Sequence, residues 1–143
     1  MFIVPSQRTS ASGIIKSMSM KHIAGIVAYV KDVDKTAEFY GKLGFTFDTR
    51  EPDHLSVRLN KFWMDFHPQD KEDKPEFQQE ANLDVKGGGL FLYVEVDSVD
   101  EFYEHVLTQG LAPSSEPHDW PWGNREFVLR DPDGYKLVFF RKI

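Results

Sequence analysis

A repeat with an offset of 66 residues limits how this chain can fold more than any other feature of its sequence. Val30 ends an apolar run, and Val96 ends a similar run 66 residues later. Gly44 and Gly110, again 66 residues apart, each end a segment with helical spacing and precede an apolar residue. The chain therefore contains the same order of strand, helix and terminal glycine twice.

Each copy of the repeat carries the signals of a capped helix. Asp32 or Asp34 can cap the first helix, whose mostly apolar residues recur at i, i+3, i+4 and i+7 from Val33. Ser98 and Glu101 form a capping box before the second helix. Because three short strands follow each helix, we predict an α+β fold of two tandem βαβββ modules. One helix would lie outside each module, and the mixed sheets would curve around a cleft suited to a ligand.

The last third of the chain predicts a β-hairpin preceded by an aromatic loop. Residues 126–130 alternate between polar and apolar side chains, and residues 135–140 are rich in aromatic and β-branched side chains. Between them, the sequence Asp-Pro-Asp-Gly at 131–134 is typical of a turn. Trp120 and Trp122 lie in the loop before this hairpin. We expect them to cover either a core or a ligand.

The repeat also defines the domain organisation. We predict one domain over residues 21–143, with modules at 21–67 and 89–143. Residues 68–88 are polar and charged without a steady period, which favours a linker or mobile loop. The first strand, predicted over 23–30, is apolar almost throughout and is expected to be covered on both faces.

Residues 1–20 differ from the rest of the chain, because they contain five serines and no acidic residue. One interpretation is a weak organelle transit peptide. The other is a flexible extension before the true start of the chain at Met18 or Met20. We favour the extension.

Composition excludes several classes of function. The chain has 143 residues and a formal net charge of −6, so we expect no nucleic-acid partner. It contains no cysteine, which excludes disulfides and thiolate chemistry and is compatible with a cytoplasmic location. No apolar run approaches the ~20 residues of a membrane span, so we expect no membrane association.

Several motifs resemble one known family. They are Val30-Lys-Asp-Val-Asp, Glu38-Phe-Tyr, Leu43-Gly-Phe and, above all, Trp122-Gly-Asn-Arg-Glu-Phe-Val-Leu-Arg-Asp-Pro-Asp-Gly. Together with the repeat, they resemble the vicinal oxygen chelate superfamily of glyoxalases, extradiol dioxygenases and bleomycin resistance proteins. The resemblance covers about residues 21–143 and is greatest for the bleomycin resistance branch. It implies a homodimer that binds a small organic ligand.

The resemblance also implies where a metal would bind. Metal-dependent members place His and Glu side chains at four positions on inner strands, which fall here on Gly25, Asp65, Phe91 and Val138. Only Asp65 is a ligand type, and His67 shares its face of the strand. Because metal sites need three or four ligands, we expect no cofactor; the alternative is a divalent metal such as Zn, Ni, Fe or Mn.

Strand alternation predicts which side chains line the cleft. Trp63, Asp65 and His67 share one face of their strand, and Phe91, Tyr93 and Glu95 share one face of another. The predicted ligand-binding residues are Trp63, Asp65, His67, Phe91, Tyr93, Trp120, Trp122, Arg125 and Glu126. Aromatic side chains with isolated charges suit a flat or cationic organic ligand.

Each candidate residue also has a structural interpretation. Strand aromatics are more often core residues than ligand contacts. The two loop tryptophans, Trp120 and Trp122, could plug the cleft or contact a second copy of the chain. Arg125 could pair with Glu126 or Asp131, and the Asp65 and His67 side chains could be an inert hydrogen-bonded pair.

Two classes of function remain open from the sequence. The first is a metal-free binding protein that sequesters an aromatic or cationic compound, as the bleomycin resistance branch does. The second is a lyase, isomerase or dioxygenase, with Asp65, His67 or Glu95 as a general base, with or without a metal. The absence of metal ligands at three of the four family positions favours the binding protein.

Overall fold

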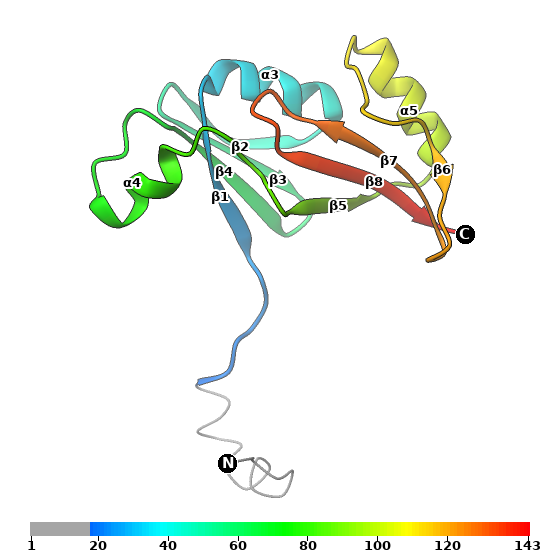
Figure 1. Ribbon diagram of the computed structural model, residues 1–143, viewed down its shortest axis with the longest axis horizontal. Helices are drawn as coiled ribbons and strands as arrows, with labels where there is room; N and C mark the ends of the chain where they lie inside the picture. The colour runs from blue at the N-terminus through cyan, green and yellow to red at the C-terminus, as the bar shows by residue number, and fades with distance from the viewer. Residues whose placement is uncertain (1–17) are drawn as a thin grey trace, which may run out of the picture.

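The computed structural model describes residues 18–143. The predicted extension at 1–20 lies outside these residues except for its last three. The elements are β1 (Gly25–Val30), α3 (Val33–Leu43), β2 (Thr46–Glu51), β3 (His54–Leu59), β4 (Phe62–Pro68), α4 (Pro75–Ala81), β5 (Phe91–Glu95), α5 (Val99–Thr108), β6 (His118–Asp119), β7 (Asn124–Arg130) and β8 (Lys136–Lys142) (Figure 1).

The two sheets have the same topology. The first has the order β1-β4-β3-β2 and the second the order β5-β8-β7-β6. In each sheet, the first strand of the module pairs in parallel with the last, and the other pairs are antiparallel. The structure thus confirms two tandem βαβββ modules with mixed sheets in an α+β fold.

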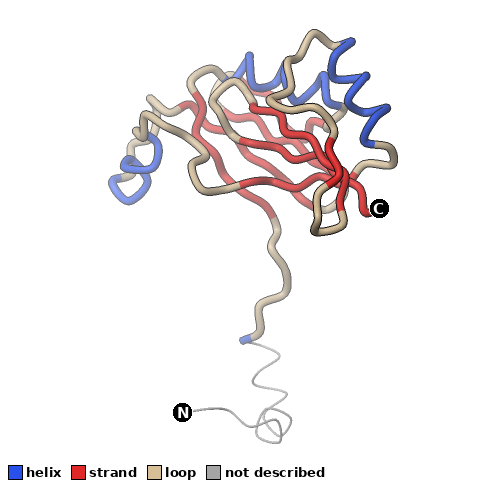
Figure 2. The backbone as a smooth tube through the Cα atoms, turned by 45° about the vertical axis from the view of Figure 1, so that its right-hand side comes forward, coloured by secondary structure: helices blue, strands red, loops and turns tan. Residues whose placement is uncertain are grey.

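Helices α3 and α5 lie on the same side of the strands, which form a curved layer below them (Figures 1 and 2). We call the sheet faces that point away from these two helices the inner faces. The helix sides of both sheets contribute to one buried apolar cluster. In the first module this cluster includes Tyr40 and Phe66, and in the second it includes Phe127 and Phe139, all at most 1% exposed. A single core therefore joins the modules.

The helix ends confirm the sequence repeat. Gly44 and Gly110 have φ angles of 100° and 77°, the left-handed region that favours glycine. The next residue in each copy returns its N–H to the last turn: Phe45 N donates to the Tyr40 carbonyl and Leu111 N to the Val106 carbonyl, both at 3.2 Å. The same local chemistry ends both helices. At the other end, Asp32 and Ser98 are the observed N-caps.

The Asp-Pro-Asp-Gly turn between β7 and β8 also attaches the second module to the first. The Tyr40 hydroxyl of α3 donates to Asp131 Oδ2 at 2.9 Å. The backbone N–H of Lys31 donates to Asp133 Oδ1 at 2.9 Å, and the Tyr135 hydroxyl donates to the Tyr29 carbonyl at 2.9 Å. These bonds all cross from one module to the other.

Two expectations need correction. The predicted linker 68–88 contains α4, whose last residue, Ala81, is fully buried. Lys86 is only 5% exposed, and its ammonium donates to the carbonyl of Ala81, the last residue of α4, and to that of Leu83, two residues beyond the helix. The inner face of strand β1 is not covered along its whole length: Ala28 on the helix side is buried, whereas Val27 on the inner face is 52% exposed.

No helix within residues 18–143 has the length and apolar character needed to cross a lipid bilayer.

Candidate functional site

An aromatic pocket of about 270 Å³ lies on the inner face of the second sheet. Phe91 and Tyr93 of β5 contribute to it, and Glu126 of β7 lies between them and the loop that carries Trp120 and Trp122. The strand and loop residues that the sequence predicted separately therefore meet in one place. We call these five residues the aromatic pocket.

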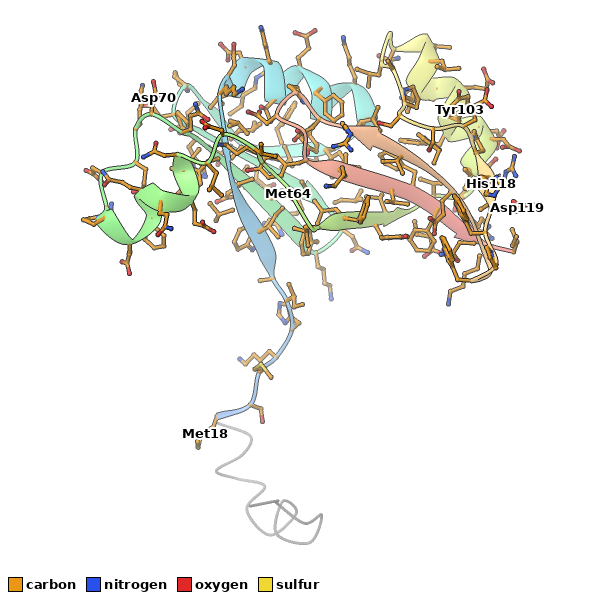
Figure 3. The ribbon with its side chains drawn as sticks, viewed as in Figure 1. Met18, Met64, Asp70, Tyr103, His118 and Asp119 are labelled. Atoms are coloured by element: carbon orange, nitrogen blue, oxygen red, sulfur yellow. The ribbon has the colours of Figure 1, made fainter. Side chains whose placement is uncertain are left out.

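The tryptophan loop is a compact turn rather than an open segment. The Trp120 and Trp122 rings stack with centroids 4.9 Å apart and planes 4° apart. Trp120 N donates to the Asn124 carbonyl at 2.9 Å, and Gly123 closes the turn with a φ angle of 92°. Figure 3 shows His118 at the end of the second sheet, next to this loop, and its ring lies 4.2 Å from that of Trp120.

Glu126 is a buried carboxylate at the floor of the aromatic pocket. Its side chain accepts hydrogen bonds from Trp122 Nε1 at 3.0 Å, Asn124 Nδ2 at 3.0 Å and the Tyr93 hydroxyl at 3.3 Å. Glu126 is 5% exposed, and within residues 18–143 no Lys, Arg or His forms an ion pair with it. Desolvation and the nearby Glu126 carboxylate raise the pKa of Tyr93. The pocket therefore combines exposed aromatic rings with negative charge.

Arg125 does not contribute to this pocket. Alternation places its side chain on the helix side of β7, where Nε lies 3.0 Å from Asp100 and Nη1 lies 2.8 Å from Asp119. The proposed pairing of Arg125 with Glu126 or Asp131 is therefore wrong. These two hydrogen-bonded carboxylates raise the pKa of Arg125.

Glu95 also lies apart from the aromatic pocket. It is exposed at the end of β5 and lines a shallow hollow with Ser98, Phe102 and His105. The structure thus separates this candidate base from Asp65 and His67.

The remaining predicted residues lie on the inner face of the first sheet. Asp65 and His67 of β4 are accompanied by His54 of β3, which is not among the residues predicted from the sequence. His54 Nε2 lies 3.1 Å from Asp65 Oδ2, and the His54 and His67 rings stack at 5.0 Å. The hairpin register supplied a signal for His54, because pairing Leu55 with Phe66 places His54 opposite His67.

Trp63 is also on β4, but its ring is packed against β1. A Cβ atom built on Gly25 would lie 2.3 Å from Trp63 Cδ2. Any larger side chain at Gly25 would therefore displace the Trp63 ring. Gly25 is one of the four family metal positions. Of the others, Val138 is 2% exposed, and the ring of Phe91 lies with its centroid 5.1 Å from the Lys136 ammonium. Gly25, Val138 and Phe91 have no metal-ligating side chain, so these three positions do not fit a metal.

A second, larger pocket of about 750 Å³ lies between β1, α4 and the loop before β5. No sequence pattern indicated this pocket, because much of its lining comes from the predicted linker. Tyr29 and His67 line one side, and Phe77 and Leu83 line the other. The Tyr29 hydroxyl donates to Glu72 Oε1 at 2.5 Å, and desolvation together with Glu72 raises the pKa of Tyr29 to about 12.

The paired βαβββ modules define the fold class, that of the vicinal oxygen chelate proteins. A model of the Glyoxalase/Bleomycin resistance protein/Dioxygenase superfamily matches residues 19–139, and the chain belongs to this superfamily. Bleomycin resistance proteins from Geobacillus stearothermophilus and Staphylococcus aureus are each 29% identical over 123 residues, covering 80% of this chain and 92% of each relative. One from Klebsiella pneumoniae is 26% identical, covering 75% and 82%.

Solved structures agree with the fold. A glyoxalase/bleomycin resistance protein/dioxygenase from Nocardioides has a TM-score of 0.76 at 22% identity, covering 94% of this chain and 93% of that one. A bleomycin-binding protein in complex with bleomycin has a TM-score of 0.61 at 23% identity, covering 86% of this chain and all of that one (100%).

Proposed function

We propose that this protein binds and sequesters an aromatic or cationic small molecule in the aromatic pocket, without a metal at the family positions and without changing the molecule. The observation that carries the proposal is the buried Glu126 carboxylate beneath exposed aromatic rings. Rings offer stacking and cation–π contacts, and a carboxylate that has no cationic partner within residues 18–143 favours a positive charge on the ligand. The relatives named as bleomycin resistance proteins support a binding role and make bleomycin the first compound to test.

Replacing Glu126 by glutamine tests the role of the carboxylate. The change keeps the size of the side chain and removes its charge. A hydrogen bond to a charged group contributes about 1.5–3 kcal/mol, so binding of a cationic ligand should weaken about ten-fold or more. Isothermal titration with bleomycin, and with cationic and neutral aromatic compounds found by thermal shift, measures the effect.

Glu95→Gln is the matched control, because it removes the same charge from the same sheet outside the pocket. Glu126→Gln should affect neutral aromatic ligands little. Equal binding of cationic ligands by Glu126→Gln and the unchanged protein would contradict the proposal. Chromatography of the ligand after incubation addresses the enzymatic alternative, since sequestration predicts quantitative recovery of the unchanged compound.

We further propose that the inner face is covered by a second copy of the chain. Val27, Phe91, Tyr93 and Trp122 are 50–60% exposed on this side of the sheets. An apolar surface of this kind is costly in water and is typical of an interface. A homodimer would cover this apolar surface, and residues of the second copy would line the other side of the cleft.

Light scattering at micromolar concentration should therefore give the mass of a dimer. A charge on the inner face, as in Val27→Lys, should shift the protein toward monomers. Leu107→Lys is the matched control, because Leu107 is 42% exposed but lies on α5, outside the inner face. A monomeric unchanged protein, or a dimer broken only by Leu107→Lys, would count against this arrangement.

A further inference from the structure

The first module carries a cluster of ligand-type side chains that the proposed function does not use. His54, Asp65 and His67 each offer one ligand atom, and these three atoms lie within 4.8 Å of one another. All three residues are half-buried. They lie on two neighbouring strands of one sheet, so their spacing depends on the register of the β3–β4 hairpin rather than on a loop.

The register explains why the three side chains converge. In the antiparallel β3–β4 pair, Leu55 pairs with Phe66, so His54 comes opposite His67. Asp65 pairs with Ser56 and is therefore the diagonal neighbour of His54 on the same face. The imidazole rings of His54 and His67 are parallel within 2°, and the carboxylate of Asp65 holds His54 Nε2 at 3.1 Å. Two imidazoles and a carboxylate therefore point from the inner face into one volume.

This set of donors has a specific chemical preference. Imidazole nitrogen and carboxylate oxygen together suit Zn, Fe, Ni and Cu ions rather than Mg or Ca ions. Ligand distances of about 2.0–2.2 Å require neighbouring donor atoms to lie about 3.3 Å apart. Here the three donor atoms lie within 4.8 Å of one another, and small side-chain rotations on rigid strands can bring them to metal-binding distances.

We propose that His54, Asp65 and His67 form a three-ligand site for a divalent transition-metal ion such as Zn²⁺. The site needs neither the second module nor a second copy of the chain. His67 also lines the pocket of about 750 Å³ next to α4, so an open coordination position would face a space large enough for a small ligand. The expectation of no cofactor depended on the four family positions, of which this site uses only Asp65.

Titration with Zn²⁺ tests the proposal directly. The full chain, carrying no histidine tag and freed of metal with a chelator, should bind one Zn²⁺ per chain by isothermal titration. The His54→Ala and His67→Ala proteins should bind about ten-fold or more weakly, because even the loss of an outer-shell partner costs a metal site about that much. The melting temperature of the unchanged protein should rise with added Zn²⁺.

His22→Ala is the matched control. His22 is exposed and precedes β1, so its loss should leave Zn²⁺ binding unchanged. If the alanine variants do not fold, His54→Phe keeps a flat ring against His67 while removing the nitrogen donors, and circular dichroism verifies its fold. A protein without saturable Zn²⁺ binding would overturn the proposal. One-to-one binding that survives in folded His54→Phe would also overturn it.

Discussion

Replacing Asp131 by alanine should lower the free energy of unfolding by about 2–3 kcal/mol at pH 7, since a buried donor left unpaired costs about 1–3 kcal/mol. Asp131 is 5% exposed and accepts hydrogen bonds from the Tyr40 hydroxyl and from the backbone N–H groups of Asp133 and Tyr135. Alanine removes all three bonds and leaves the fully buried Tyr40 hydroxyl without its acceptor. It also removes a bond that joins the two modules.

The contribution of Asp131 should depend on pH. Burial raises its pKa from 3.8 to about 6, although the hydrogen bonds from Tyr40 and the turn act in the opposite direction. Between about pH 4 and pH 6, Asp131 therefore keeps a proton in the folded protein that the unfolded chain has already released. As the pH rises from about 4 to about 6, the free energy of unfolding should fall by up to about 3 kcal/mol, at 1.36 kcal/mol per pKa unit.

Asp131→Asn is the matched variant, because asparagine keeps an acceptor for the turn but cannot ionise. Urea unfolding at several pH values and a constant protein concentration gives the free energies. The free energy of unfolding of the unchanged protein minus that of Asp131→Asn isolates the single carboxyl group, and this signed difference should fall by up to about 3 kcal/mol between pH 4 and pH 6. A signed difference that stays constant between pH 4 and 7, or that rises with pH, would contradict the raised pKa.

Replacing Trp122 by alanine should weaken the binding of bleomycin, or of a screened aromatic ligand, by about ten-fold or more. An aromatic pair contributes about 0.5–1.5 kcal/mol beyond burial, and the lost contact area adds to this. At equal protein concentration the melting temperature should fall only slightly, because Trp122 is 60% exposed in the free chain and is only one of the four residues named for the proposed dimer surface. Isothermal titration and thermal unfolding of the same preparation separate the two effects.

Trp122→Phe provides the control for this variant. It keeps an aromatic ring for stacking but loses the Nε1–H bond to Glu126 and part of the ring area, so a large part of the affinity should return. The alternative is that Trp122 is a structural plug. A large fall in melting temperature with unchanged affinity in Trp122→Ala would support the plug and exclude the proposed stacking role.

Trp122 and Asp131 differ in how far their roles could be predicted from sequence. The Asp-Pro-Asp-Gly motif predicted a turn, because its signals are local and depend only on neighbouring residues. The bond from Tyr40 to Asp131 spans 91 positions, and no local pattern indicates it. For Trp122, the sequence indicated an aromatic loop near a sheet but left its partners open.

The modular architecture followed from the sequence alone. Helix caps, terminal glycines and strand alternation are short-range signals, and their repetition at one offset indicated two equivalent modules. Alternation also placed Tyr93 and Glu126 on inner faces, where the structure finds them in one pocket. Such predictions succeed because the period of a strand or helix is set by backbone geometry.

Tertiary structure decided the features that depend on contacts between distant segments. Helix α4 forms in a stretch with weak periodicity, where Ala81 is buried and the Lys86 ammonium donates to the Ala81 carbonyl at the end of the helix. The partners of Arg125 come from α5 and β6, because strand pairing turns its side chain toward the helix. In each case the deciding energy comes from burial and strand pairing, which a linear pattern does not contain.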